Sequence, residues 1–373
     1  MKRKAKAPPI SPSQPTAERP DPAFKMQANV EQVTEKSEAL YFTDGDVALC
    51  AASAARKKTI ALRVHKVVLS IHSSVFRDMF SFPFNPAVNE TLGGVPVVRM
   101  QDDADDLELL VSAFYKPTKM RYDKRNRPDR SELRSLLSLS AKYQVDVLRA
   151  QVIEYLESEW PRTLEEWFLL KSQMSDRTRY ITLAEGHEPE ERSEKSFPEP
   201  AADLRLALDF KIASIVPALY YRLSISSVEF EFHDDIGEVH DLSADWNLLQ
   251  AKDWKRLAVG KERLLRAVDE LGIIYQYIPG NWCKEKESCK TVTEEQLRML
   301  ADRCRTCMGF EQADLVDLIF GMLSEVDKKR NSIGYYCLSC TYAVESQLRK
   351  KLKEAWDGLV ETFKLYDINE DIM

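Results

Sequence analysis

Six of the seven cysteines fall into three spaced pairs in the C-terminal part of the chain. The pairs are Cys283 with Cys289, Cys304 with Cys307, and Cys337 with Cys340. Two thiolates separated by two residues can face the same Zn²⁺ ion, and two such pairs complete a closed tetrahedral site. Spacing alone therefore favours the two C-x-x-C pairs as ligands. A thioredoxin-like redox role is disfavoured, because no βαβ pattern surrounds either pair.

A second role for these cysteines is packing. Cysteine is among the most frequently buried residue types, and a helical spacing runs through Leu297, Leu300, Cys304 and Cys307. This pattern favours a helical core without metal, so we expect no cofactor and keep zinc as the alternative. We also expect no enzymatic activity, because the sequence has no Ser or Cys nucleophile with a base, no phosphate-binding loop and no paired acidic motif.

The composition is that of a soluble protein with more than one core. The chain has 373 residues and a formal net charge of -7, whereas nucleic-acid binding usually shows as a basic domain. No apolar run approaches the roughly 18 residues of a membrane span, and no apolar core follows the N-terminal lysines as in a secretory signal. We therefore expect an intracellular protein, cytoplasmic, nuclear or both, with no membrane contact and no nucleic-acid partner.

The stretch Leu62–Phe80 changes its hydrophobic period along its length. Its first half alternates like a half-buried strand, and Val67, Ile71 and Val75 then recur at helical spacing on one face. A strand is therefore expected to run into a short helix. The stretch also carries the pattern H-x-x-V-L-x-x-x-S-x-x-F-x-x-M-F, formed by His65, Val68, Leu69, Ser73, Phe76, Met79 and Phe80.

This pattern resembles the core signature of the BTB/POZ domain, a protein-interaction module that is not an enzyme. Asp46-Val47 upstream, the strand-like Val95–Met100 and the helical Ala141-Lys142-Tyr143 downstream match further parts of the family's layout. The resemblance implies an α+β fold in which a sheet of three to five short strands is flanked by helices.

We divide the chain into three parts. Residues 1–38 are basic and proline-rich and are expected to be a disordered tail. Residues 39–160 are expected to form the BTB/POZ domain. Residues 161–373 are expected to be mostly helical, with an acidic, proline-rich insert at about 185–203 and one plausible short strand at Val228–Phe232.

The BTB/POZ resemblance also suggests interface residues. Asp46 and Arg63 fall on positions where BTB domains often carry a paired acid and base near the centre of a homodimer. Val88-Asn89-Glu90 fits the apolar-x-Glu triplet that adaptors of cullin-type ubiquitin ligases place in the corresponding loop. These residues imply a protein partner, either a second copy of the chain or a cullin.

The C-terminal part resembles that of basidiomycete fungal BTB proteins, in which a C-x5-C pair, an L-C-x-x-C pair and a W-x-x-L-x-x-x-F helix recur. If zinc binds, the resemblance selects Cys283, Cys289, Cys337 and Cys340 as its ligands. The expected function is non-catalytic protein–protein interaction, by self-association or partner binding. An adaptor of a cullin-type ubiquitin ligase and a transcriptional regulator are the alternatives, although the five histidines supply no Cys-Cys-His-His finger.

Overall fold

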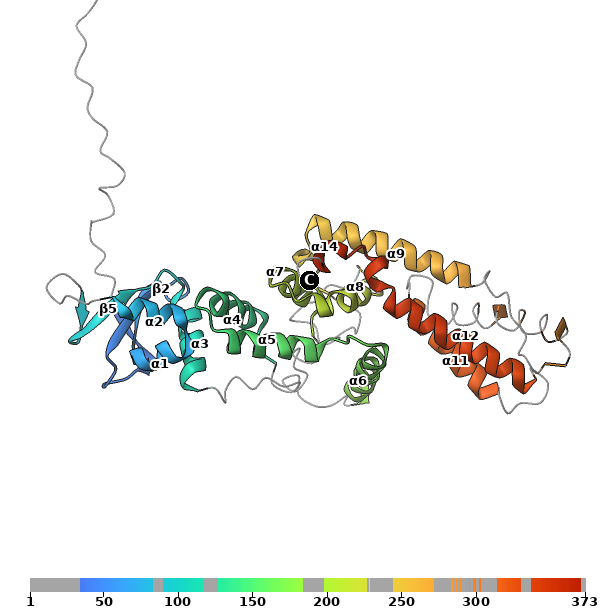
Figure 1. Ribbon diagram of the computed structural model, residues 1–373, viewed down its shortest axis with the longest axis horizontal. Coiled ribbons are helices and arrows are strands. Elements are labelled where there is room, and N and C mark those ends of the chain that lie inside the picture. Colours follow the sequence, from blue (N-terminus) through green and yellow to red (C-terminus); the bar gives the residue numbers. More distant parts are fainter. Residues whose placement is uncertain are drawn as a thin grey trace, which may run out of the picture. The chain divides into compact units, whose positions relative to one another are not determined.

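The computed structural model describes residues 34–82, 90–116, 127–183, 198–226, 228, 244–271, 283–284, 286–287, 289, 295, 298–299, 302, 314–329 and 337–369. The chain divides into two compact units, one within residues 1–64 and 86–104 and the other within residues 65–85 and 105–373. Figure 1 labels some of their helices and strands. Each unit is described by itself below.

The first unit is built on a five-stranded sheet with the strand order β1-β3-β2-β5-β4. Its strands are β1 (Thr34–Tyr41), β2 (Val47–Ser53), β3 (Lys58–Val64), β4 (Thr91–Leu92) and β5 (Val95–Arg99). The central strands β2 and β3 pair antiparallel, while β1 pairs parallel to β3 and β5 pairs parallel to β2. Nearly every residue of β2 is buried, as expected for a strand covered on both faces. The strand predicted at Val95–Met100 is confirmed as β5.

The N-terminal tail expected at residues 1–38 extends too far, because a strand begins at Thr34. Residues 34–38, assigned there to the tail, belong to β1, and residues 1–33 lie outside the described part of the chain. The Ser37 Oγ accepts a hydrogen bond from the Leu40 N–H at 3.1 Å, and Leu40 is buried. Composition gave no sign of this strand, because β1 is held by the edge of β3 and not by its own periodicity.

The second unit is helical. Its helices are α1 (Lys66–His72), α2 (Ser74–Ser81), α3 (Ala104–Tyr115), α4 (Arg130–Lys142), α5 (Asp146–Glu159), α6 (Leu164–Leu183), α7 (Pro200–Asp209), α8 (Val216–Ser224), α9 (Ala251–Leu271), α11 (Leu315–Lys329), α12 (Leu338–Asp357), α13 (Leu359–Thr362) and α14 (Tyr366–Asn369). The predicted α+β class, a small sheet with helices followed by a helical region, is therefore confirmed. The strand predicted at Val228–Phe232 lies outside the described residues apart from Val228.

The start of α6 shows how local sequence positions a helix. The Thr163 Oγ1 accepts a hydrogen bond from the Glu166 N–H at 3.2 Å, and the Glu166 carboxylate accepts one from the Thr163 N–H at 3.2 Å. This reciprocal capping box satisfies two N–H groups that a helix start otherwise leaves unpaired. The sequence Thr-x-x-Glu is a helix-start pattern, and α6 begins directly after Thr163.

The acidic insert expected at about 185–203 is shorter at its C-terminal end than the sequence suggested. Helix α7 begins at Pro200, and the Glu199 carboxylate caps it by accepting hydrogen bonds from the N–H groups of Ala201 and Ala202. Proline at the first helical position and an acidic residue before it are helix-start signals. Because Glu199 and Pro200 are acidic and proline residues like those of the insert, composition alone assigns them to it. Residues 185–197 of the insert lie outside the described ranges.

An apolar stripe near the C-terminus is buried along its whole length and runs from α12 through α13 to the residue after it. Its members are Val344, Leu348, Leu352, Trp356, Leu359 and Phe363. Helix α12 ends at Asp357. The next residue, Gly358, donates its N–H to the Glu354 carbonyl, and α13 follows directly. A β-carbon at Gly358 would lie 2.9 Å from that carbonyl oxygen, so the break depends on a residue without a side chain.

Candidate functional site

The signature stretch after β3 is organised by two polar residues, His65 and Ser73. The Tyr115 hydroxyl accepts a hydrogen bond from the His65 N–H at 2.9 Å and lies 3.0 Å from the His65 Nδ1. Ser73 separates α1 from α2 in an extended conformation. Its hydroxyl accepts from the Phe76 N–H at 3.1 Å and donates to the Tyr143 carbonyl at 2.6 Å. Both side chains therefore have structural roles, and the single helix expected here is two helices joined at Ser73.

The apolar signature residues form the core around this junction. Phe76 is fully buried and its ring stacks on Tyr143, with ring centroids 4.6 Å apart. Leu69 is also fully buried, whereas Met79 and Phe80 are half-buried. The apolar members of the signature thus specify packing.

Asp46 and Arg63 lie near the same end of the β2–β3 pair. Asp46 is exposed, and its N–H donates to the Val64 carbonyl at 3.0 Å. The Arg63 Nε donates to the Gly45 carbonyl at 2.9 Å. A β-carbon at Gly45 would lie 2.9 Å from the Arg63 Cγ, so glycine is needed where the arginine crosses the turn. The geometry keeps both charges near one end of the central β2–β3 pair, and their role at an interface stays a prediction.

Glu90, the acidic residue of the predicted cullin-binding triplet, has an intramolecular partner. Its carboxylate accepts two hydrogen bonds from Arg99, from Nε at 2.9 Å and from Nη2 at 2.8 Å. Both side chains are exposed, so the pair contributes little stability. Val88 lies outside the described residues, and cullin binding stays a prediction.

Helix α1 exposes two of the apolar residues that recur at helical spacing in the signature stretch. Val67 is 63% exposed and Ile71 is 73% exposed. They lie four residues apart, on one side of the helix. We call this pair the α1 apolar pair. Helical spacing alone does not show whether an apolar face is buried or exposed. In α1 the buried residue is Leu69, and the face with Val67 and Ile71 is exposed.

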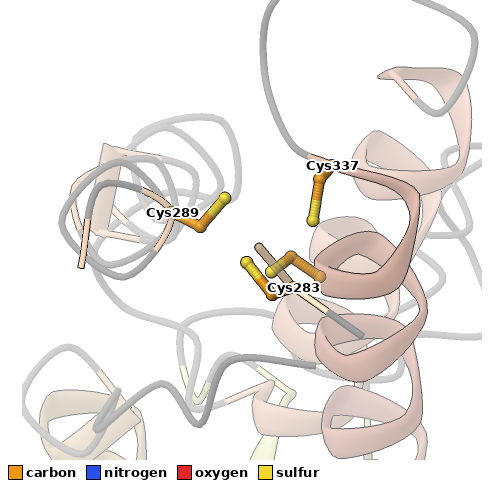
Figure 2. Close-up of side chains that lie close together, drawn as sticks. Cys283, Cys289 and Cys337 are labelled. Atoms are coloured by element: carbon orange, nitrogen blue, oxygen red, sulfur yellow. The ribbon is translucent and has the colours of Figure 1, made fainter. Parts of the chain in front are cut away.

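Four cysteines come together in the C-terminal part. The sulfur atoms of Cys283, Cys289, Cys337 and Cys340 all lie within 4.8 Å of one another, and none of the four forms a disulfide. Figure 2 shows the sulfurs of Cys283, Cys289 and Cys337 turned toward a common centre. These are the four that the fungal resemblance selected. The middle pair, Cys304 and Cys307, lies outside the described residues.

The four thiols differ in their surroundings. Cys283 and Cys340 are buried, Cys289 is half-buried and Cys337 is exposed at the start of α12. Loss of solvent is the largest cause that raises the pKa of the Cys289 and Cys337 thiols, and hydrogen bonds among the four thiols contribute in both directions. A coordinated metal ion reverses this preference, because it deprotonates the thiols that bind it.

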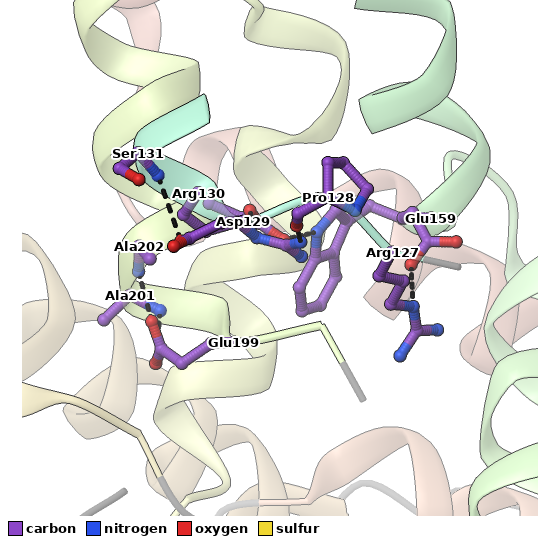
Figure 3. Close-up of polar contacts among 11 residues, drawn as sticks. Arg127, Pro128, Asp129, Arg130, Ser131, Glu159, Glu199, Ala201 and Ala202 are labelled. Carbon is purple, nitrogen blue, oxygen red and sulfur yellow. Dashed lines mark hydrogen bonds and ion pairs between the residues drawn. The ribbon is translucent and has the colours of Figure 1, made fainter. Parts of the chain in front are cut away.

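A buried polar cluster joins α4 and α5 to α7 within the second unit (Figure 3). The Asp203 carboxylate is fully buried and pairs with Arg130 at 2.6 Å, and the Trp160 Nε1 donates to it at 2.8 Å. Arg127 and Glu159 form a second buried pair at 2.6 Å. The predicted boundary between residues 160 and 161 is therefore crossed by the Arg130–Asp203 ion pair, which sequence patterns did not indicate.

Comparison with known families gives one match. The model of the BTB/POZ domain matches residues 46–159, a range that includes β2 to β5 and α1 to α5. The chain thus contains a BTB/POZ domain, the class of protein-interaction module that the signature stretch resembles. No curated protein matches the chain. Within the described ranges, no helix combines the length and apolar character needed to cross a bilayer.

Proposed function

We propose that the chain is a non-catalytic interaction protein whose BTB/POZ domain binds a second copy of itself. The observation that carries the proposal is the match of residues 46–159 to a family of protein-interaction modules. The signature residues support it, because His65, Ser73 and Phe76 are used in capping and packing. Their chemistry is committed to holding the domain together.

The α1 apolar pair is the contact surface that we propose. Fully burying one Val or Ile side chain contributes about 1.5–3 kcal/mol. A symmetric dimer presents the same surface from both copies, so Val67 and Ile71 each count twice. Separately, Asp46 and Arg63 of the first unit carry charges of opposite sign, and such charges favour one orientation of a partner more than they add affinity.

Sedimentation velocity of the full chain over a range of concentrations tests this proposal. We expect a reversible dimer that Val67→Asp combined with Ile71→Asp converts to monomer. Val147→Asp is the matched control, because Val147 is also 73% exposed and lies on α5 of the same domain. Asp46→Lys should also weaken the dimer, and adding Arg63→Asp should restore part of it.

Two results would contradict the proposal. A wild-type chain that stays monomeric at every concentration excludes self-association. A dimer that is unchanged by the α1 double substitution but lost on Val147→Asp places the contact on another surface. Circular dichroism of each variant shows whether the fold is kept, so that a loss of the dimer is not confused with unfolding.

A further inference from the structure

The four clustered cysteines have the spacing of a metal site. In a tetrahedral zinc–thiolate centre with Zn–S bonds of about 2.3 Å, neighbouring sulfurs are about 3.8 Å apart. Sulfurs in a disulfide are about 2.05 Å apart. The observed arrangement, with all four within 4.8 Å and none in a disulfide, needs only small side-chain adjustments to close around one ion.

The start of α12 positions two of the four sulfurs. Cys337 is the residue that precedes α12, and Cys340 lies in its first turn. Both the Cys340 and Thr341 N–H groups donate to the Cys337 carbonyl, at 2.9 and 3.0 Å. These two hydrogen bonds fix the backbone of the first turn, and with it the positions of both cysteines. The two-residue spacing turns both sulfurs toward the same side.

The other two sulfurs come from a segment that is distant along the chain. Cys283 and Cys289 precede Cys337 by about fifty residues in the printed sequence, yet their sulfurs complete the same cluster. Four soft thiolate ligands select zinc over the harder cations that prefer oxygen. With four protein ligands no position remains for water or substrate, which is the arrangement of a structural and not a catalytic centre.

We propose that Cys283, Cys289, Cys337 and Cys340 bind one Zn²⁺ ion as a structural centre that fixes the start of α12. This replaces the metal-free cysteine core that the sequence favoured. Periodicity around Cys304 contains no information on whether the pair Cys283 and Cys289 meets the pair Cys337 and Cys340 in space, and the structure brings these two pairs together. The centre would link the segment around residues 283–289 to α12, whose buried residues Val344 and Leu348 belong to the core of the second unit.

Metal analysis of the full chain, purified under reducing conditions without chelator, tests the proposal. We expect about one zinc per chain. Cobalt substituted for zinc should give the absorption of a tetrahedral ion and an intense thiolate-to-cobalt charge-transfer band. Cys289→Ser and Cys337→Ser should each lower the zinc content several-fold. These two positions are chosen because they are the more exposed of the four, so the substitutions disturb packing least.

Two controls separate metal loss from unfolding. Cys50→Ser replaces a buried cysteine of β2 outside the cluster and should leave the zinc content unchanged. Cys337→His keeps a zinc ligand and should retain the ion while weakening the charge-transfer band. A wild-type chain without zinc that gives no cobalt–thiolate band overturns the proposal. So does zinc that stays at full occupancy in both serine variants, since the ion would then be bound elsewhere.

Discussion

Gly260, in the middle of α9, allows a clear test of packing in the second unit. A β-carbon at this position would lie 1.9 Å from the Phe363 Cδ1 and 2.0 Å from its Cε1. The ring cannot easily retreat, because Phe363 is fully buried and stacks on Tyr220 with ring centroids 5.5 Å apart. The Phe363 ring therefore packs directly against the backbone of α9 at Gly260, in the space that a side chain would fill.

Two opposing effects decide the outcome of Gly260→Ala. Replacing glycine by alanine inside a helix stabilises it by about 1 kcal/mol. Overpacking a filled core costs about 1–3 kcal/mol, and losing a buried phenylalanine altogether costs about 3–5 kcal/mol. Because the overlap at Phe363 is severe, we expect the clash to win and the free energy of unfolding to fall by about 1–3 kcal/mol.

Urea unfolding followed by tryptophan fluorescence measures this change, since all six tryptophans lie at residue 160 or beyond and so report on the second unit. The decisive comparison is the same substitution in a Phe363→Ala background. There the ring is gone, and Gly260→Ala should stabilise by its helix-propensity gain of about 1 kcal/mol. An equal cost in both backgrounds, or a gain in the wild-type chain, would refute the reasoning.

Two further predictions concern buried carboxylates. Asp203→Ala should lower the free energy of unfolding by about 3–5 kcal/mol, measured by the same urea assay, because it leaves the Arg130 guanidinium without its partner; a loss under about 1 kcal/mol would contradict a dominant role for the pair. Burial raises the pKa of Glu199 above its ordinary value, so the folded state binds a proton more tightly than the unfolded state. Its contribution to stability is therefore present at acidic pH and lost as pH rises through the folded pKa. Glu199→Gln should flatten that part of the pH–stability curve, and a curve of unchanged slope would count against the assignment.

Features that depend on neighbouring residues could be predicted from the sequence. The reciprocal hydrogen bonds of Thr163 and Glu166 lie within one helical turn, and the strand-to-helix change after Val64 follows from a continuous pattern. Ser73 was identified as a signature residue, but its role in dividing the helix required the distant Tyr143 carbonyl. Local chemistry thus located the elements, and long-range contacts set their ends.

The cysteine cluster shows the opposite case. Spacing favoured pairs two residues apart, and periodicity favoured a core without metal, because neither contains information on which segments meet. The structure brings together two pairs that are separated along the chain. Similarly, β1 forms a strand because it pairs with the edge of β3. Pro200 is the first residue of α7 and does not extend the acidic insert.

The BTB/POZ match ends at residue 159, but its last helices, α4 and α5, make contacts with residues beyond that limit. Arg130 on α4 reaches Asp203, the Arg149 Nη2 donates to the Phe210 carbonyl at 3.2 Å, and the Ser214 hydroxyl donates to Glu157 on α5 at 2.5 Å. A buried ion pair is costly when only one partner is present, so Arg130 at the start of α4 depends on Asp203 of α7 for its partner. The BTB/POZ domain of this chain is therefore stabilised from outside its family-defined limits, and its last two helices form part of the same core as the helices that follow.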